Sequence, residues 1–252
     1  MTVDYTVKGR VAYVTLNRPE KLNAISQPLR NDLYEAFRSF RDDDDAWVAI
    51  LSANGKHFSA GRDLIERVEQ GDDLPGPSNA DIYALQRTIY KPMLSAVHGV
   101  CLAAGTGIVL STDIRVASQT ARFGWPQVKR GVASVSGPTL LSKIVPYNIA
   151  AEYMFTGEFM PAEEAHRWGL VNRVVEEGEA LKTAEQMAEQ LLENSPVAMR
   201  AMKEATIRCA HLSANDAYAL ANLVVQRVDA SEDSKEGLLA FKEKRDPVWA
   251  GR

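Results

Sequence analysis

Hydrophobic and polar residues alternate at the start of the chain. Residues 5–7 and 11–16 follow the two-residue period of a strand, and Lys8 and Gly9 between them are typical of a turn. The pattern therefore predicts a β-hairpin.

A three- and four-residue period of apolar positions follows the hairpin. Leu29, Leu33, Phe37 and Phe40 then share one face of a helix, and Ser26 is placed to cap its N-terminus. Residues 47–51 are a short, wholly apolar run, which favours a parallel strand buried on both faces.

The same order recurs further along the chain. Residues 93–97 predict a second buried strand, and a turn of small residues leads from it into an apolar helix around 108–110. Residues 114–117, 121–123 and 169–175 predict further strands. Strands separated by helices predict an α/β fold with right-handed crossovers.

From residue 180 onward only helical periodicity is present, with capping signals at Ser195, Ser213 and Ser231. A helical tail of about 55 residues is too small to form a good core alone. We therefore expect it to pack on the α/β body or on neighbouring subunits. Residues 71–79 predict a mobile surface loop, of the kind that often lies over a substrate site.

Composition narrows the class of protein. The 252 residues are 46% hydrophobic and 25% charged, with a net charge of -4, which argues against a nucleic-acid partner. The N-terminus has no apolar signal core, and the most apolar stretch, residues 97–110, is too short and too rich in glycine to span a membrane. Cys101 and Cys209 lack metal-ligand spacing, so we expect reduced thiols, no metal site and a cytoplasmic protein.

Two segments, residues 57–64 and 98–107, share a design in which small residues lie between an apolar strand and a helix. Small side chains let a carbonyl oxygen approach the backbone N–H groups at a helix start, where the helix dipole favours negative charge. Two such groups on one oxygen would stabilise an oxyanion. Each segment alone is also explained by close strand–helix packing, and neither is a dinucleotide or phosphate-loop motif.

Four segments together resemble a known family. Residues 16–24 (LNRPEKLNA), 58–64 (FSAGRDL), 97–115 and 230–247 are similar, in order, to the crotonase (enoyl-CoA hydratase/isomerase) superfamily. The resemblance implies a spiral of ββα units over residues 1–195 and a helical trimerisation region over 196–252. It also implies a homotrimer or dimer of trimers, and a coenzyme A thioester substrate with no separate cofactor.

The resemblance assigns the two oxyanion donors to the backbone N–H groups of Arg62 and Ala104. Position 62 is commonly small in the family, so the Arg62 side chain is a departure. It either lies over the pocket rim in an ion pair or contacts a substrate carboxylate or coenzyme A phosphate.

The remaining binding positions are also implied by the resemblance. Lys21, Leu22 and Ala24 would contact the adenine end of coenzyme A. Ala60, Asp63 and Leu64 would flank the thioester end. Lys244 of a neighbouring subunit would supply a positive charge to the phosphates. Asp63 could instead have a structural role as the cap of the helix that follows it.

The acid–base residues of a hydratase are missing. By the resemblance its two glutamates would fall at Gly107 and Gln127, and a third place where relatives carry an acid is Val135. Hydration by two glutamates is therefore not expected. Gln127 remains a candidate for positioning water or substrate.

Other residues are nominated for proton transfer or for lining the acyl site. Tyr83 and Tyr90 are candidate acids, while His57 and His98 are equally explained as structural residues. Ser134 and Ser136 are interpreted as polar lining or as a helix cap, and Trp125 as a wall of the acyl pocket or as core.

Two functional hypotheses remain open. The first is an enzyme that stabilises an acyl-CoA enolate or oxyanion, with isomerisation, hydration, C–C cleavage and thioester hydrolysis as possible outcomes. The second is a non-catalytic acyl-CoA binding protein that kept the pocket and lost the chemistry.

Overall fold

The computed structural model describes residues 1–71 and 74–252 and begins with the predicted hairpin. Strands β1 (Val3–Lys8) and β2 (Val11–Leu16) pair antiparallel. Helix α1 (Gln27–Asp42) follows, and the Ser26 hydroxyl accepts a hydrogen bond from the Leu29 N–H at its start. These elements confirm the predictions for the first 40 residues.

The central sheet has the strand order β1-β2-β3-β4-β6-β9. Its later strands run parallel to β2; they are β3 (Val48–Ala53), β4 (Met93–Val97), β6 (Ile114–Ser118) and β9 (Arg173–Val175).

A second, smaller sheet contains β5 (Val100–Leu102), β7 (Arg122–Gly124) and β8 (Phe159–Pro161). The chain passes from β4 to β5 and from β6 to β7, so it moves from one sheet to the other in successive turns. This is the spiral α/β architecture that the sequence predicts.

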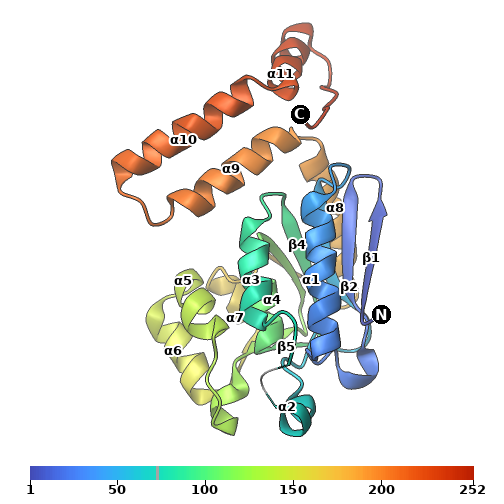
Figure 1. The fold of residues 1–252 in the computed structure, drawn as a ribbon, viewed down its shortest axis with the longest axis vertical. Coiled ribbons are helices and arrows are strands. Elements are labelled where there is room, and N and C mark those ends of the chain that lie inside the picture. Colours follow the sequence, from blue (N-terminus) through green and yellow to red (C-terminus); the bar gives the residue numbers. More distant parts are fainter. Residues whose placement is uncertain (72–73) are drawn as a thin grey trace.

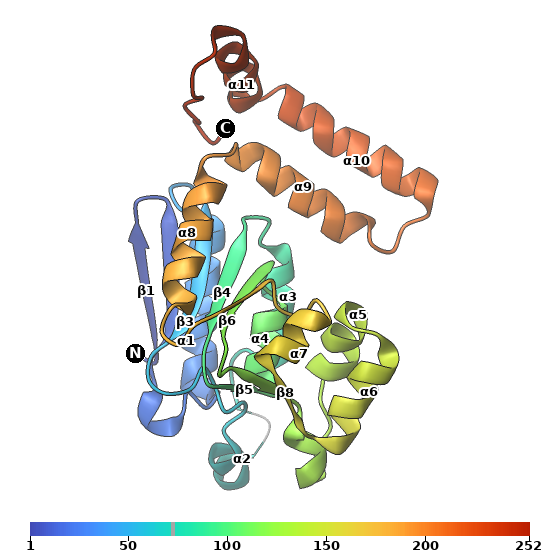
Figure 2. The ribbon, with the colours of Figure 1, turned by 180° about the vertical axis from the view of Figure 1, so that it is seen from behind.

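Helices cover both faces of the central sheet (Figures 1 and 2). On one face lie α1, α3 (Asn79–Thr88) and α4 (Ala104–Leu110), which enclose the larger apolar core. On the other lies α8 (Ala180–Leu192), whose alanines pack against the strands. Alternate residues of β3 enter the two cores, which explains why its sequence is apolar without interruption.

Shorter elements complete the body. They are α2 (Leu64–Gln70), α5 (Ser142–Ile144), α6 (Tyr147–Thr156), α7 (Ala162–Arg167), the 3-10 turns Pro19–Lys21 and Pro126–Arg130, and the π-turn Gly137–Leu141.

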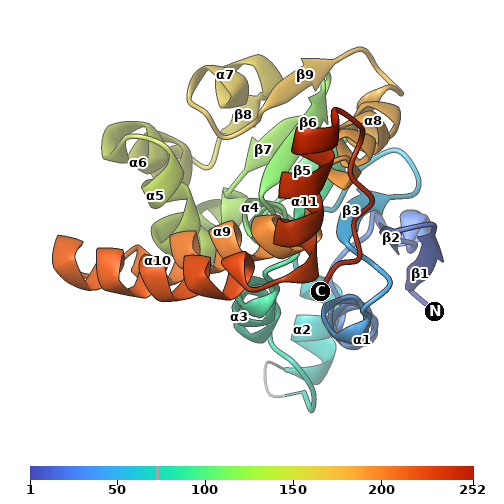
Figure 3. The ribbon, with the colours of Figure 1, turned by 90° about the horizontal axis from the view of Figure 1, so that it is seen from above.

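The C-terminal helices α9 (Pro196–Cys209), α10 (Ala214–Asp229) and α11 (Glu232–Glu243) project from this body (Figures 1 and 3). The hydroxyls of Ser195, Ser213 and Ser231 cap them as predicted. In the described part of the chain, no helix is long and apolar enough to cross a membrane.

Two local predictions need correction. Residues 169–172 are not strand: Gly169 has a positive φ, and the N–H groups of Leu170 and Val171 donate to the Ala165 carbonyl, so this stretch closes helix α7. Asn79 is not in a loop either, because Ser78 caps helix α3 in front of it. Residues 72–73 of the predicted loop lie outside the described residues.

Candidate active site

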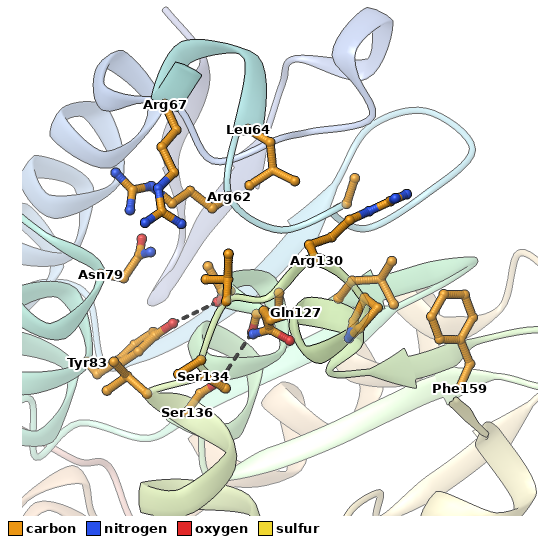
Figure 4. Close-up of a pocket in the computed structure, with 18 residues that line it drawn as sticks. Arg62, Leu64, Arg67, Asn79, Tyr83, Gln127, Arg130, Ser134, Ser136 and Phe159 are labelled. Carbon is orange, nitrogen blue, oxygen red and sulfur yellow. Dashed lines mark hydrogen bonds between the residues drawn. The ribbon is translucent and has the colours of Figure 1, made fainter. Parts of the chain in front are cut away.

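One pocket of about 410 Å³ lies where the two small-residue turns meet. Its walls come from residues 60–67, from helix α3, from residues 102–104, from residues 126–136 and from Phe159 (Figure 4). The volume is in the range usual for small-molecule sites. The pocket brings together Ala60, Arg62, Leu64, Ala104 and Gln127, which the sequence nominated, and it also takes in Ser134 and Ser136.

The first turn directs the peptide groups of Arg62 away from Ile25. The Ile25 N–H donates to the Gly61 carbonyl (2.7 Å), and the Asp63 N–H donates to the Ile25 carbonyl (3.1 Å). This bonding makes Arg62 the bridge partner of Ile25. In such a parallel bridge the N–H and C=O of the intervening residue point away from the partner strand. The Arg62 amide therefore faces away from Ile25.

Glycines hold the two turns in direct contact. Gly61 has a φ of 87°, and a Cβ placed there would lie 2.8 Å from both the Ala103 Cβ and the Leu102 carbonyl oxygen. A Cβ at Gly105 would lie 2.7 Å from the Ser59 Cβ. Residues 59–62 therefore pack so closely on residues 102–105 that neither glycine position has room for a side chain.

The second turn contains a strained residue. Ala103, at the N-cap of α4, has φ 52° and ψ -111°, a region that residues with a side chain rarely adopt. Such strain costs about 1–3 kcal/mol and tends to occur at functional sites. Ala104 is the first residue of α4, so its N–H belongs to the first turn, where helical N–H groups have no intrahelical acceptor.

Comparisons with known proteins identify the family. The family model described as enoyl-CoA hydratase/isomerase matches residues 6–252. The chain belongs to the enoyl-CoA hydratase/isomerase family. This membership confirms the resemblance seen in the sequence and makes the chain an acyl-CoA-processing enzyme of that family.

Curated and solved relatives match nearly the whole chain. Carnitinyl-CoA dehydratases of Shigella flexneri and Escherichia coli K12 are each 39% identical over 259 residues, covering 98% of this chain and 97% of the relative. The solved enoyl-CoA hydratase of Mycobacterium tuberculosis H37Rv is 35% identical with a TM-score of 0.93, covering 100% of this chain and 99% of that one.

The structure explains one missing hydratase acid sterically. A Cβ at Gly107 would lie 2.4 Å from both the Cζ and the hydroxyl oxygen of Tyr83, and 2.8 Å from the Ser136 Cβ. The Tyr83 phenol thus occupies the space in which a side chain at position 107 would begin. Gln127 and Val135, the other two positions where the resemblance would put an acid, both line the pocket.

Tyr83 is held in the neutral form beside the second turn. It is 7% exposed, and its hydroxyl donates to the Ala104 carbonyl at 3.1 Å (Figure 4). Burial raises the pKa of the Tyr83 phenol far above its ordinary value, with a smaller contribution from Cys101. The raised pKa argues against Tyr83 as the acid and leaves it as a hydrogen-bond donor to the Ala104 carbonyl.

Gln127 lines the pocket and carries a buried polar atom without a partner in the described part of the chain. Its Oε1 atom is buried and accepts no hydrogen bond within the described residues. The same holds for Oδ1 of Asn79, which lines the pocket one helical turn before Tyr83. Buried polar atoms usually have partners, so both point to a polar ligand or to water.

The two histidines near the turns have structural contacts. His57 Nδ1 accepts from the Val100 N–H (3.3 Å), and burial, followed by repulsion from Lys56, lowers the pKa of His57. His98 Nε2 lies 2.9 Å from the Gly55 carbonyl oxygen. Neither histidine lines the pocket, and nor does Tyr90.

Several nominated binding residues lie outside the pocket, Trp125 and Asp63 among them. Trp125 is 1% exposed in the larger core and donates from Nε1 to the Ser136 hydroxyl (3.3 Å), which favours the core interpretation. Asp63 caps helix α2 and pairs with Arg18 at 2.7 Å. Burial would raise the pKa of Asp63, but the hydrogen bonds from Arg18 and the α2 backbone outweigh it and lower that pKa.

The positions predicted for the adenine end of coenzyme A lie on the surface beside the first turn. Lys21 and Leu22 are exposed, Ala24 is half-buried, and the Leu22 carbonyl accepts from the N–H of Ala60, which lines the pocket. Lys244 lies at the end of α11, in the projecting helices and away from the pocket of its own chain (Figure 1).

Sequence reasoning missed several lining residues, among them Arg67, Asn79, Arg130 and Phe159. Only Asn79 had a usable signal, because it lies four residues before Tyr83 and would share its face on a helix. That helix was not predicted. The other three reach the pocket only through tertiary packing.

Proposed function

We propose that this chain binds an acyl-CoA so that the N–H groups of Arg62 and Ala104 hold the thioester oxygen. The pair would stabilise an enolate or tetrahedral oxyanion as charge develops on that oxygen. The observation that carries the proposal is the contact of the two turns, which places both residues on one pocket. The reaction class is that of a lyase or isomerase acting on a coenzyme A thioester.

The chemistry proceeds without a pair of catalytic glutamates. Among the described residues, the lining contains no Asp or Glu. Gln127 is proposed to hold a water molecule or a substrate hydroxyl through its side-chain amide, because the residue lines the pocket. Double-bond isomerisation, hydration by a held water, C–C cleavage and thioester hydrolysis are the outcomes to be distinguished.

The alternative function is non-catalytic binding of acyl-CoA, and the lack of a carboxylate in the described lining favours it. Mass spectrometry of saturated, enoyl and aromatic CoA thioesters incubated with the protein separates the two functions. We expect at least one thioester to be converted, and Gln127→Ala to lower its kcat about tenfold through loss of one hydrogen bond. Tight binding with no product from any thioester would instead establish the binding protein.

The acyl end of the substrate is proposed to be anionic. Arg62, Arg67 and Arg130 all line the pocket, and Arg62 and Arg67 lie on the same side as Asn79 (Figure 4). Guanidinium groups recognise carboxylates through paired N–H donors. The carnitinyl group named for the relatives carries a quaternary ammonium, which offers no acceptor to a guanidinium N–H.

A charge series tests this assignment. We expect glutaryl-CoA to bind at least tenfold more tightly than valeryl-CoA, which has the same chain length, and carnitinyl-CoA to bind most weakly. Isothermal calorimetry measures all three, and Arg67→Gln should narrow the difference between glutaryl-CoA and valeryl-CoA. Preference for carnitinyl-CoA would overturn the anionic assignment while leaving the oxyanion pair intact.

The projecting helices are proposed to assemble copies of the chain into a trimer or dimer of trimers. Leu223 on α10 is 61% exposed and Phe241 on α11 is 86% exposed, which leaves large apolar surfaces in water. Lys244 is distant from the pocket of its own chain. In the assembly it would instead reach the coenzyme A phosphates bound to a neighbouring subunit.

Sedimentation analysis checks the assembly. The molar mass from sedimentation equilibrium is expected to be three or six times the 27.8 kDa of one chain. Leu223→Glu should shift the population toward monomer, whereas Val68→Glu, which changes an exposed apolar residue on α2, should not. A monomeric wild-type protein at micromolar concentration would contradict the proposal.

A further inference from the structure

Ser136 contacts the carbonyl of the very peptide whose N–H is assigned to the oxyanion. The Ser136 hydroxyl donates to the Ala103 carbonyl at 3.2 Å, and the Gly107 N–H donates to the same oxygen at 3.2 Å. In a trans peptide the C=O and the following N–H point in opposite directions. Fixing the Ala103 carbonyl therefore fixes the direction of the Ala104 N–H.

The strain at Ala103 creates a competing orientation. At its φ of 52°, rotating ψ by about half a turn from -111° would bring Ala103 into the left-handed helical region. That region is more accessible to a residue with a Cβ than the observed one. The rotation would turn the Ala104 N–H out of the pocket and turn the Ala103 carbonyl into it.

Ser136 is itself held firmly enough to oppose this rotation. It is 2% exposed, and its oxygen accepts from Trp125 Nε1 at 3.3 Å. Ser134, whose hydroxyl lies 3.4 Å away, accepts from the Gly137 N–H and so fixes the backbone that carries Ser136. Of the two acceptors within reach of the Ser136 hydroxyl proton, the Ala103 carbonyl at 3.2 Å is nearer than the Ser134 hydroxyl at 3.4 Å.

We infer that Ser136 is a positioning residue that locks the Ala103–Ala104 peptide with its N–H toward the thioester oxygen. The inference rests on the proposed oxyanion pair. A hydroxyl donating to the carbonyl also polarises the peptide, which makes its N–H a better donor. Ser136 acts through the backbone and need not touch the substrate.

The test follows the bound carbonyl rather than turnover alone. Butyryl-CoA labelled with ¹³C at the thioester carbonyl is bound to the protein, and the carbonyl stretch is recorded by infrared difference spectroscopy. In the wild type we expect a shift to lower frequency. Ser136→Ala should lose part of that shift and lower kcat about tenfold. Ser142→Ala, which removes a hydroxyl bonded to the Pro138 carbonyl outside the pocket, should change neither quantity.

A second substitution separates locking from simple damage to the fold. Glycine has no preference for the left-handed region over the observed one, so Ala103→Gly added to Ser136→Ala should recover much of the carbonyl shift and of kcat. Absence of recovery, or a full carbonyl shift in Ser136→Ala alone, would overturn the role of Ser136. An unshifted carbonyl in the wild type would instead refute the oxyanion pair, and this inference with it.

Discussion

Replacing Ala104 with proline is expected to lower kcat by about 10²–10³-fold, corresponding to the loss of one oxyanion donor. Ala104 is the first residue of α4, where proline is tolerated because its missing N–H has no intrahelical acceptor and its fixed φ suits a helix start. The substitution thus removes the proposed donor with little change to the helix.

The control for this variant is Ala104→Gly, which retains the N–H and should retain most of the activity. Both proteins are assayed with a thioester that the wild type converts, and thermal unfolding establishes that each is folded. Equal kcat for the folded proline variant and the wild type would rule out the Ala104 N–H as a donor.

Gly107→Ala is expected to destabilise the protein by about 1–3 kcal/mol, as overpacking of a dense core usually does. The added Cβ would lie 2.4 Å from the Tyr83 ring and hydroxyl oxygen, and both residues are buried. Urea unfolding measures the effect. The same clash means that Gly107→Glu alone should not create hydratase activity.

The clash can be isolated with a double-mutant cycle. Tyr83→Leu shortens the side chain and removes the two closest clashing atoms, so Gly107→Ala should cost less in that background, with the Ser136 Cβ at 2.8 Å as the remaining close contact. The coupling free energy between positions 83 and 107 should therefore exceed 1 kcal/mol, as expected for residues in contact. Additive effects of the two substitutions would show that Tyr83 does not fill the space beside Gly107.

Local features of the fold were predictable because their causes lie within a few residues. Ser26 precedes an apolar period and caps it, and Ser195, Ser213 and Ser231 do the same for the last helices. The stretch after Gly169 misled the prediction because its apolar residues are buried by the α7 turn rather than by strand pairing. An apolar run indicates that its residues are buried, but it does not indicate which backbone conformation they adopt.

The candidate site was only partly predictable, for a similar reason. Arg62 and Ala104 were nominated from local turns and a family pattern, and both line the pocket. The relation between Tyr83 and Gly107 joins residues 24 positions apart through packing of α3 on α4, and no periodicity encodes it. Ala103 was missed as well, since its sequence context does not reveal a positive φ.

The contact between Gly61 and Ala103 has a consequence for redesigning this enzyme. Because no space separates Gly61 from Ala103, the first and second turns behave as one block, and moving either turn would disturb the other. New reactivity is best sought by leaving this block untouched and varying lining residues outside it, namely Asn79, Gln127 and Phe159. Libraries restricted to those three positions would change the groups offered to a bound substrate while the proposed N–H donors stay in place.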